Sequence, residues 1–308
     1  NEMTDPVTPQ LRAIDAIYPT DRTFDEALAA GVTMAITKPG SANVIGGQFA
    51  AVKTYGRTVE EKLVSAPVAM KIAFGENPKR VYYGQKKSPS TRMATASILR
   101  EALFKAKEYM EKKEAAAGDP EKAPAFDLKW EALIPVLKKE IPLKAHAHRA
   151  DDIMTAIRIA EEFGLRVTLD HCTEGHLIAD LIAAKGLPAI VGPSFSDRSK
   201  VELRNLTFET PGILSKAGVK IAIMTDSPVI PSQYLPLCAK LAVRNGLEPE
   251  EALKAITINP AEIVGLADRV GSLEAGKDAD LVVFDRHPLA FEAEVERVFV
   301  NGKEVVSR

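Results

Sequence analysis

A repeated unit of helix, glycine and short apolar strand constrains the fold of this chain more than any other feature. The unit first appears over residues 24–37, where an amphipathic segment ends at Gly31 and an apolar run follows. It recurs at three further glycines: Gly164, Gly186 and Gly218. Glycine commonly ends helices because it adopts left-handed dihedrals at little cost, and short apolar runs that alternate with helices are typical of buried parallel strands. The sequence therefore predicts βα units around a parallel sheet.

Six strands of this kind can be counted, among them residues 68–74 and 143–146. Six strands fit either a doubly wound sheet or most of an eight-stranded barrel. The glycine-rich residues 38–48 are expected to form the loop after the first of these strands. Neither a G-x-G-x-x-G after a strand nor a G-x-x-x-x-G-K-[ST] motif occurs, so the usual nucleotide-binding reasons for a doubly wound sheet are absent.

The C-terminal residues have a different character. Three short strands are expected at residues 281–284, 295–300 and 304–306. Asn301-Gly302, between the last two, is a strong signal for a two-residue hairpin turn. A small β-module is thus predicted after the βα repeats.

Composition limits the partners of the chain. The 308 residues include 40 basic and 42 acidic side chains, and the net charge of -2 gives no sign of nucleic-acid or anionic-membrane binding. Two cysteines, Cys172 and Cys238, cannot form a disulfide framework, so we expect a reducing compartment, the cytoplasm. A small-molecule substrate is expected, with no membrane partner, and a homo-oligomer is left open.

Metal-compatible side chains stand at the ends of three predicted strands. His146 and His148 end the strand at residues 143–148, and His171 follows residues 167–170. Asp226 ends the strand at residues 219–225. In a parallel barrel, the carboxyl ends of the strands are where side chains from different strands converge.

The spacing between these residues fits whole βα units. One unit separates His146 from His171 and two separate His171 from Asp226, which places them on strands n, n+1 and n+3. Two imidazoles and a carboxylate suit Zn²⁺ or a similar divalent ion that activates water. The alternative for each residue is structural: a hydrogen-bonded histidine, or an aspartate that forms a turn with Ser227-Pro228.

The C-terminal quarter carries a resemblance to a known family. Its motifs are INPA at residues 258–261, GSLE at 271–274 and GKDADLVVF at 276–284. This stretch resembles the segment where members of the amidohydrolase superfamily, near its imidazolonepropionase-like and metal-dependent dipeptidase branch, leave the barrel and enter a small β-sandwich. Residues 143–148, 169–172 and 224–228 are similar to the motifs of the fifth, sixth and eighth barrel strands. The resemblance implies a TIM-like (β/α)8 barrel over residues 1–265 and C-terminal strands of the sandwich over residues 266–308.

Carried over residue by residue, the resemblance implies His146 and His171 as metal ligands. Asp226 would be the eighth-strand aspartate, which binds metal and passes a proton from the attacking water to the leaving group. His148 stands where relatives often have a residue that contacts substrate or supports the site. The implied cofactor is one or two divalent ions, most simply zinc.

Lys71 is a further candidate ligand. Binuclear relatives carry a carboxylated lysine on a middle strand, and Lys71 is the only lysine in the middle of a comparably apolar strand. Three alternatives stay open: this strand is the third of the barrel, Lys71 extends its ammonium from a strand end, or Glu76 supplies a carboxylate at the same rim.

One family feature does not occur in this sequence. Family members open the barrel with a first strand that bears a His-x-His pair, and no such pair precedes Gly31. His146-Ala147-His148 does not fit that place, because His171 follows after only one βα unit. The resemblance therefore implies a chain that lacks the first strand, the upstream half of the sandwich and two metal ligands. We expect the chain alone to bind metal poorly and to be inactive.

The implied reaction is metal-dependent hydrolysis of a non-ester C–N bond, in an amide, a cyclic amide or a dipeptide. Two alternatives stay open. One is a non-catalytic scaffold with the same barrel, and the other is an aminohydrolase of the same superfamily that deaminates a ring.

Overall fold

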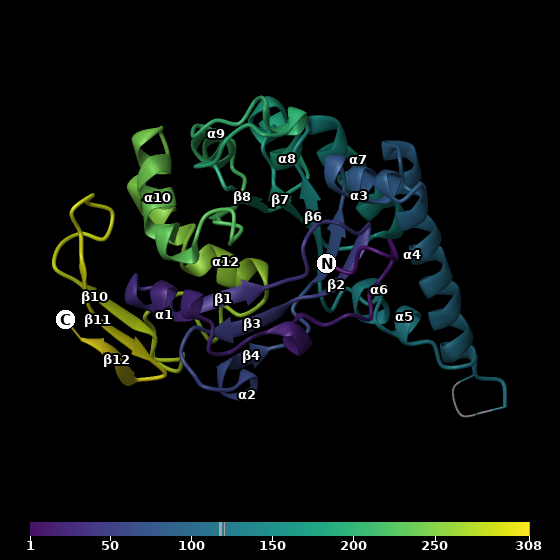
Figure 1. Cartoon of the computed structure of the whole chain (residues 1–308), viewed down its shortest axis with the longest axis horizontal. Helices are drawn as coiled ribbons and strands as arrows, with labels where there is room; N and C mark the ends of the chain where they lie inside the picture. Colours follow the sequence, from purple (N-terminus) through teal and green to yellow (C-terminus); the bar gives the residue numbers. More distant parts are fainter. Residues whose placement is uncertain (117–118, 120, 308) are drawn as a thin grey trace.

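A six-stranded sheet forms the centre of the computed structural model, which describes residues 1–116, 119 and 121–307. The strand order is β2-β5-β6-β7-β8-β9 (Figure 1). The strands are β2 (Ile45–Gln48), β5 (Met70–Ala73), β6 (Leu143–Ala147), β7 (Val167–His171), β8 (Ala189–Val191) and β9 (Ile221–Ile223). All pairs from β5 to β9 are parallel, whereas β2 is antiparallel to β5. The predicted parallel α/β architecture is thus confirmed, although β2 and β9 are not paired within the described residues and the sheet does not close there.

Helices connect the parallel strands, as the repeated unit predicts. Between β5 and β6 lie α3 (Glu76–Gly84), α4 (Arg92–Ala115), α5 (Leu128–Glu131) and α6 (Ile134–Leu137). The later crossovers contain α7 (Ala150–Phe163), η2 (Gly175–Ile178), α8 (Ala179–Ala184), η3 (Val201–Leu203) and α9 (Thr210–Lys216). After β9 come η4 (Ser232–Tyr234), α10 (Leu235–Arg244), α11 (Pro249–Lys254) and α12 (Ile258–Ile263). In the part of the chain that the structure describes, none of the helices is both long and apolar enough to cross a membrane.

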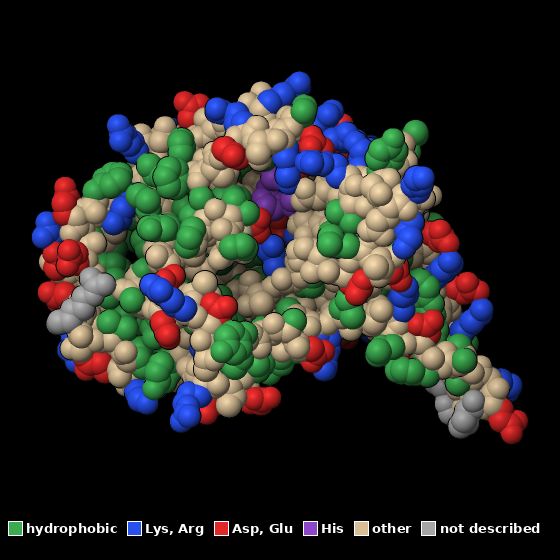
Figure 2. Space-filling model, viewed as in Figure 1, with side chains coloured by type: hydrophobic (Ala, Val, Ile, Leu, Met, Phe, Trp, Pro, Cys, Tyr) green, Lys and Arg blue, Asp and Glu red, His purple; other side chains and the backbone are tan. Residues whose placement is uncertain are grey.

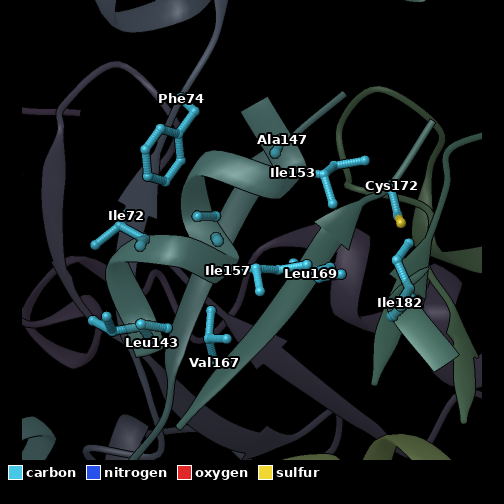
Figure 3. Close-up of a cluster of buried hydrophobic side chains, with 14 of the residues drawn as sticks. Ile72, Phe74, Leu143, Ala147, Ile153, Ile157, Val167, Leu169, Cys172 and Ile182 are labelled. Atoms are coloured by element: carbon cyan, nitrogen blue, oxygen red, sulfur yellow. The ribbon is translucent and has the colours of Figure 1, made fainter. Parts of the chain in front are cut away.

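Helix α7 shows how the sequence pattern produces this packing. The helix ends at Gly164, which has the left-handed φ of 62° that glycine adopts readily. Its fully buried Ile153 and Ile157 join the core with Leu143 of β6 and Leu169 of β7 (Figure 3). Burial of each such side chain contributes about 1.5–3 kcal/mol, so the strand ends above this core are held firmly.

The first predicted strand was assigned to the wrong sheet. Residues 32–37 contain β1 (Met34–Thr37), but β1 pairs antiparallel with β3 (Ala50–Lys53) in a separate sheet that β4 (Leu63–Ser65) completes. A parallel neighbour requires a crossover of a dozen or more residues. Residues 38–49 leave no room for one, because they already contain β2 rather than the single predicted loop. The remaining short helices of this region are η1 (Ala13–Ala16), α1 (Arg22–Ala29) and α2 (Val59–Lys62).

The C-terminal strands form the predicted module. β10 (Leu281–Phe284), β11 (Val295–Val300) and β12 (Lys303–Ser307) make a three-stranded antiparallel sheet at the end of the molecule opposite α4 (Figure 1). Asn301 and Gly302 have φ values of 50° and 76°, as a two-residue hairpin turn with positive φ requires. The turn prediction is confirmed, while the division of the chain into two domains at residue 265 stays a prediction.

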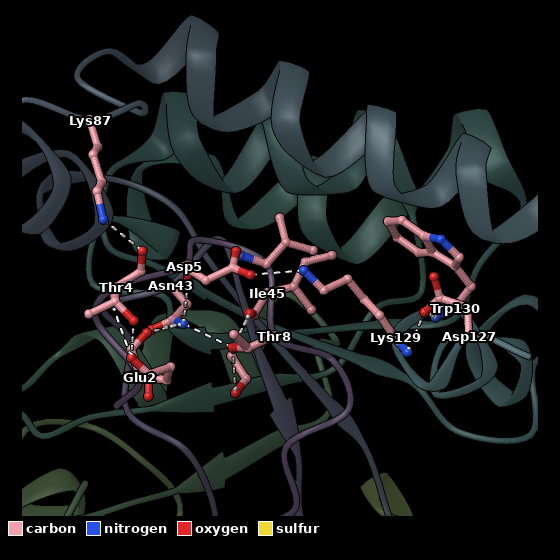
Figure 4. Close-up of polar contacts among 12 residues, drawn as sticks. Glu2, Thr4, Asp5, Thr8, Asn43, Ile45, Lys87, Asp127, Lys129 and Trp130 are labelled. Carbon is pink, nitrogen blue, oxygen red and sulfur yellow. Dashed lines mark hydrogen bonds and ion pairs between the residues drawn. The ribbon is translucent and has the colours of Figure 1, made fainter.

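The N-terminal residues are tied to the central sheet by one buried amide. Asn43 Nδ2 donates to the carbonyl oxygens of Glu2 and Asp5 at 2.6 and 2.9 Å, and to Thr8 Oγ1 at 2.9 Å (Figure 4). The Thr8 backbone N–H donates to the carbonyl oxygen of Ile45 in β2 at 2.9 Å. The sheet edge at β2 is therefore covered by the first residues of the chain.

Candidate metal centre

Three histidines meet at the carboxyl end of the central sheet. His146 lies in β6, His148 directly follows that strand, and His171 ends β7. One ring nitrogen from each lies within 4.8 Å of the others, and none of the three residues is more than 5% exposed. Figure 2 shows the histidine side chains at the bottom of a hollow in this face of the molecule.

Strand register explains why these rings converge. Alternate residues of a strand share a face, so His146 and His148 point the same way. β7 pairs Asp170, rather than His171, with His146. His171 nevertheless reaches the cluster, because it leaves the regular strand with a φ of 71°. Positive φ is uncommon in residues other than glycine, and such conformations concentrate at functional sites.

Hydrogen bonds orient all three imidazoles. His146 Nε2 accepts from Asn77 Nδ2 at 3.3 Å. His171 Nδ1 donates to the carbonyl oxygen of Gly192 at 2.8 Å, so the Nε2 lone pair is left facing the cluster. His148 Nδ1 pairs with Thr173 Oγ1 at 2.7 Å. Burial lowers the pKa values of His146 and His148 well below their usual range, and it lowers the pKa of His171 as well. All three rings are therefore neutral, the form that binds metals.

Asp226 comes to the same place from the end of β9. Its Oδ2 lies 3.9 Å from His171 Nε2, and its Oδ1 forms a 2.7 Å ion pair with Lys38 Nζ. Burial alone raises the pKa of Asp226, but the neighbouring His171 and the ammonium of Lys38 outweigh it, so the pKa lies below the usual range. β6, β7 and β9 are strands n, n+1 and n+3 of the sheet, as the sequence spacing predicts.

Lys71 lies on β5, the strand next to β6. The residue is 0% exposed, so it does not extend its ammonium to solvent. Its Nζ has no hydrogen-bond partner among the described residues, and burial lowers its pKa to about 7. A buried amine that loses its proton near neutral pH has the chemistry that carboxylation requires.

Glu76, the alternative carboxylate, is engaged elsewhere. Its backbone N–H donates to Glu202 Oε2 at 2.8 Å, and its Oε1 accepts from the Glu202 backbone N–H at 3.1 Å. Glu202 was missed by sequence reasoning, although its Oε1 lies 3.8 Å from His148 Nε2. It occurs in the charged segment 197–204, which looks like a solvated loop. Nothing in that pattern signals a residue that is 0% exposed.

The polar atoms of the cluster fit a divalent cation. Buried ring nitrogens without a hydrogen-bond partner in the described part of the chain include His146 Nδ1 and His171 Nε2. Unpaired buried polar atoms cost free energy, so native proteins keep few of them and those few require an explanation. Imidazole nitrogens and a carboxylate are ligands that divalent transition metals prefer, and zinc is among them.

Known proteins resemble this chain along almost its whole length. The model of the Amidohydrolase family matches residues 20–305. A crystal structure described as an amidohydrolase from Thermotoga maritima MSB8 is 50% identical, has a TM-score of 0.97 and covers 100% of this chain and 80% of its own.

Two curated proteins match over part of their own length. Amidohydrolase tasK of Hapsidospora irregularis is 30% identical over 98% of this chain, which corresponds to 33% of tasK. Imidazolonepropionase of Thermoplasma acidophilum is 41% identical over 29% of this chain and 21% of that protein. The chain thus matches a third or less of the length of these two relatives.

Proposed function

Because the chain belongs to the amidohydrolase family, we propose that it supplies the catalytic site of a metal-dependent hydrolase that cleaves a non-ester C–N bond. The bond would belong to an amide, a cyclic amide or a dipeptide of small size. One observation carries the proposal: the histidine cluster and Asp226 meet at the carboxyl ends of neighbouring parallel strands. In α/β barrels this is the end where catalytic residues stand.

His146, His171 and Asp226 would hold the metal, for which we propose zinc. Neutral imidazoles and an ionised aspartate are the protonation states that zinc binding needs. When bound, the ion would supply a Lewis acid that lowers the pKa of water and polarises a carbonyl group. Lys71, once carboxylated, would be the ligand for a second ion.

Asp226 would move the proton during hydrolysis. Its depressed pKa keeps the carboxylate ionised at neutral pH, ready to accept a proton from the attacking water. The carboxylic acid formed in this way would then donate the proton to the leaving nitrogen. His148, whose Nδ1 is held by Thr173, would present Nε2 to the substrate.

The proposal includes a cytoplasmic location, which two buried cysteines without a disulfide support. Light scattering would measure whether the chain assembles into a homo-oligomer.

The natural protein that contains this sequence provides the test. We expect it to retain one or two divalent ions per chain in elemental analysis and to release an amine and a carboxylate from at least one member of an amide library. Ammonia as the only nitrogen product would favour the aminohydrolase alternative. Absence of both bound metal and hydrolysis would favour the scaffold and contradict the proposal.

A further inference from the structure

Glu202 is held in one orientation by the backbone of another segment. Its Oε2 accepts from the Glu76 backbone N–H, and its own backbone N–H donates to Glu76 Oε1. Gly75 makes room for this contact, because a Cβ at that position would lie 2.5 Å from Glu202 Oε2. One carboxylate oxygen of Glu202 is therefore fixed, and the direction of the other is fixed with it.

The second oxygen points towards the histidine cluster without a partner. Glu202 Oε1 is buried and has no hydrogen bond within the described residues. It lies 3.8 Å from His148 Nε2 and 3.8 Å from Lys200 Nζ, and both separations exceed hydrogen-bond distance. A buried acceptor without a hydrogen bond destabilises the protein, unless a bound ligand donates a hydrogen bond to it.

The neighbouring charges indicate what kind of donor fits. Lys200 Nζ donates to Asn77 Oδ1 at 2.6 Å, which holds the ammonium beside the carboxylate. This ammonium disfavours a second cation close to Glu202. A neutral amide fits this site, because its N–H can donate a hydrogen bond to the Glu202 carboxylate and its carbonyl oxygen can accept one from the Lys200 ammonium.

We propose that Glu202 and Lys200 form a recognition site for an N–H amide, so that Glu202 determines specificity for substrates whose amide nitrogen carries a hydrogen. The inference rests on the proposed function, because it places this amide beside the metal-binding histidines. Amides with a fully substituted nitrogen have no donor for Glu202 Oε1. They leave that oxygen unpaired and are selected against.

Two neutral probes test the site: 2-pyrrolidinone, which has an N–H, and N-methyl-2-pyrrolidinone, which does not. Binding to the chain is measured by ligand-observed NMR titration, with and without added zinc. We expect the N–H probe to bind about tenfold more tightly, the value of one hydrogen bond to a charged group. Equal affinities, or no binding of either probe, would overturn the inference.

Three variants test whether the preference for the N–H probe depends on Glu202 and Lys200. Glu202→Gln keeps the shape but loses the charge, and should reduce the preference to about threefold or less. Glu174→Gln is the matched control: it is a buried carboxylate whose two oxygens accept from the Ala150 N–H and Asn205 Nδ2, and it should keep the preference. Lys200→Met should weaken both probes equally, because both carry the carbonyl oxygen.

The outcomes separate this inference from the proposed function. An N–H preference that depends on Glu202 in a protein without metal or hydrolysis would contradict only the proposed function. Normal metal content and hydrolysis with no preference would contradict only the recognition site. If Glu202→Gln does not fold, Glu202→Asp replaces it: the shorter side chain keeps the charge but withdraws the oxygen from the site, so the preference should again fall to about threefold or less, and an unchanged preference would overturn the inference.

Discussion

The Nζ atom of Lys71 lies 4.0 Å from Oδ2 of Asp170, while the other oxygen of that carboxylate accepts a 2.8 Å hydrogen bond from Lys144. Asp170 thus directs its short contact to Lys144 and leaves Lys71 without one. A fully buried ammonium in this position is poorly compensated, and burial lowers the pKa of Lys71 to about 7. The stability of the folded protein should therefore depend on whether Lys71 is protonated.

In the metal-free protein, Lys71→Met should be more stable than the wild type at pH 7 and below. There the folded wild type buries a charge that the unfolded chain exposes to water. Between pH 7 and about 10.4 the folded amine is neutral while the unfolded one still binds a proton, so wild-type stability rises by at most about 1.4 kcal/mol per pH unit. The advantage of Lys71→Met should therefore shrink as the pH increases. Urea denaturation at a series of pH values measures it, with the exposed Lys216→Met as control. A difference between the variants that does not change with pH would contradict burial as its cause.

Asp226→Asn should lose turnover without losing the fold. The amide cannot accept the proton from water, and general acid–base groups typically contribute 10²–10⁴-fold, so we expect kcat to fall by about 100-fold or more. The ion pair with Lys38 is also lost, and since the two side chains are only 20% and 18% exposed we expect a moderate loss of stability in the melt without loss of the fold. The measurement is kcat of the natural protein, beside a circular dichroism melt. Asp180→Asn, at an exposed position of α8, is the control. Full activity of Asp226→Asn would remove the proton-transfer role.

The strand ends could be predicted from the sequence because one rule places them. Helices that end at glycine before short apolar runs predict parallel strands, and the spacing of His146, His171 and Asp226 then places all three at one edge. Residues 34–37 have the same local pattern but pair with β3, because pairing depends on the length of the connection that follows. Local apolarity identifies a strand without identifying its neighbour.

Glu202 illustrates a different limit. Its burial results from contacts with Gly75 and Glu76, more than a hundred residues earlier in the chain. No sequence pattern within residues 197–204 predicts that contact. His171 is intermediate between these cases: its position at a strand end was predictable, whereas the φ of 71° that brings it to His146 was not.

If His171 is the zinc ligand that we propose, His171→Gln should weaken zinc binding by at least about 100-fold, because loss of a ligand costs no less than loss of the groups that support ligands. His171 Nε2 faces the cluster without a partner among the described residues, and glutamine offers no imidazole nitrogen there. Competition against a fluorescent chelator measures the affinity. His176→Gln serves as the matched control, since His176 Nδ1 pairs with Thr210 Oγ1 at 3.0 Å and the residue is not part of the cluster. Equal losses in both variants would show that zinc binding does not depend on His171.

Asn43→Ala should destabilise the fold by about 1–3 kcal/mol, because it removes the hydrogen bonds of one buried amide to three acceptors, of which the Asp5 carbonyl oxygen keeps the Tyr82 hydroxyl as a donor. The carbonyl oxygens of Glu2 and Asp5 and the hydroxyl of Thr8 share the single amide nitrogen of Asn43, which is 1% exposed. Urea denaturation should show a lower midpoint with an unchanged slope, as expected for lost stability without a change in the surface exposed on unfolding. Gln85→Ala is the control: its Nε2 donates to the Met3 carbonyl oxygen in an exposed contact, so its loss should cost less than about 0.5 kcal/mol. If both variants lose the same stability, the amide of Asn43 does not anchor the N-terminal residues to the sheet.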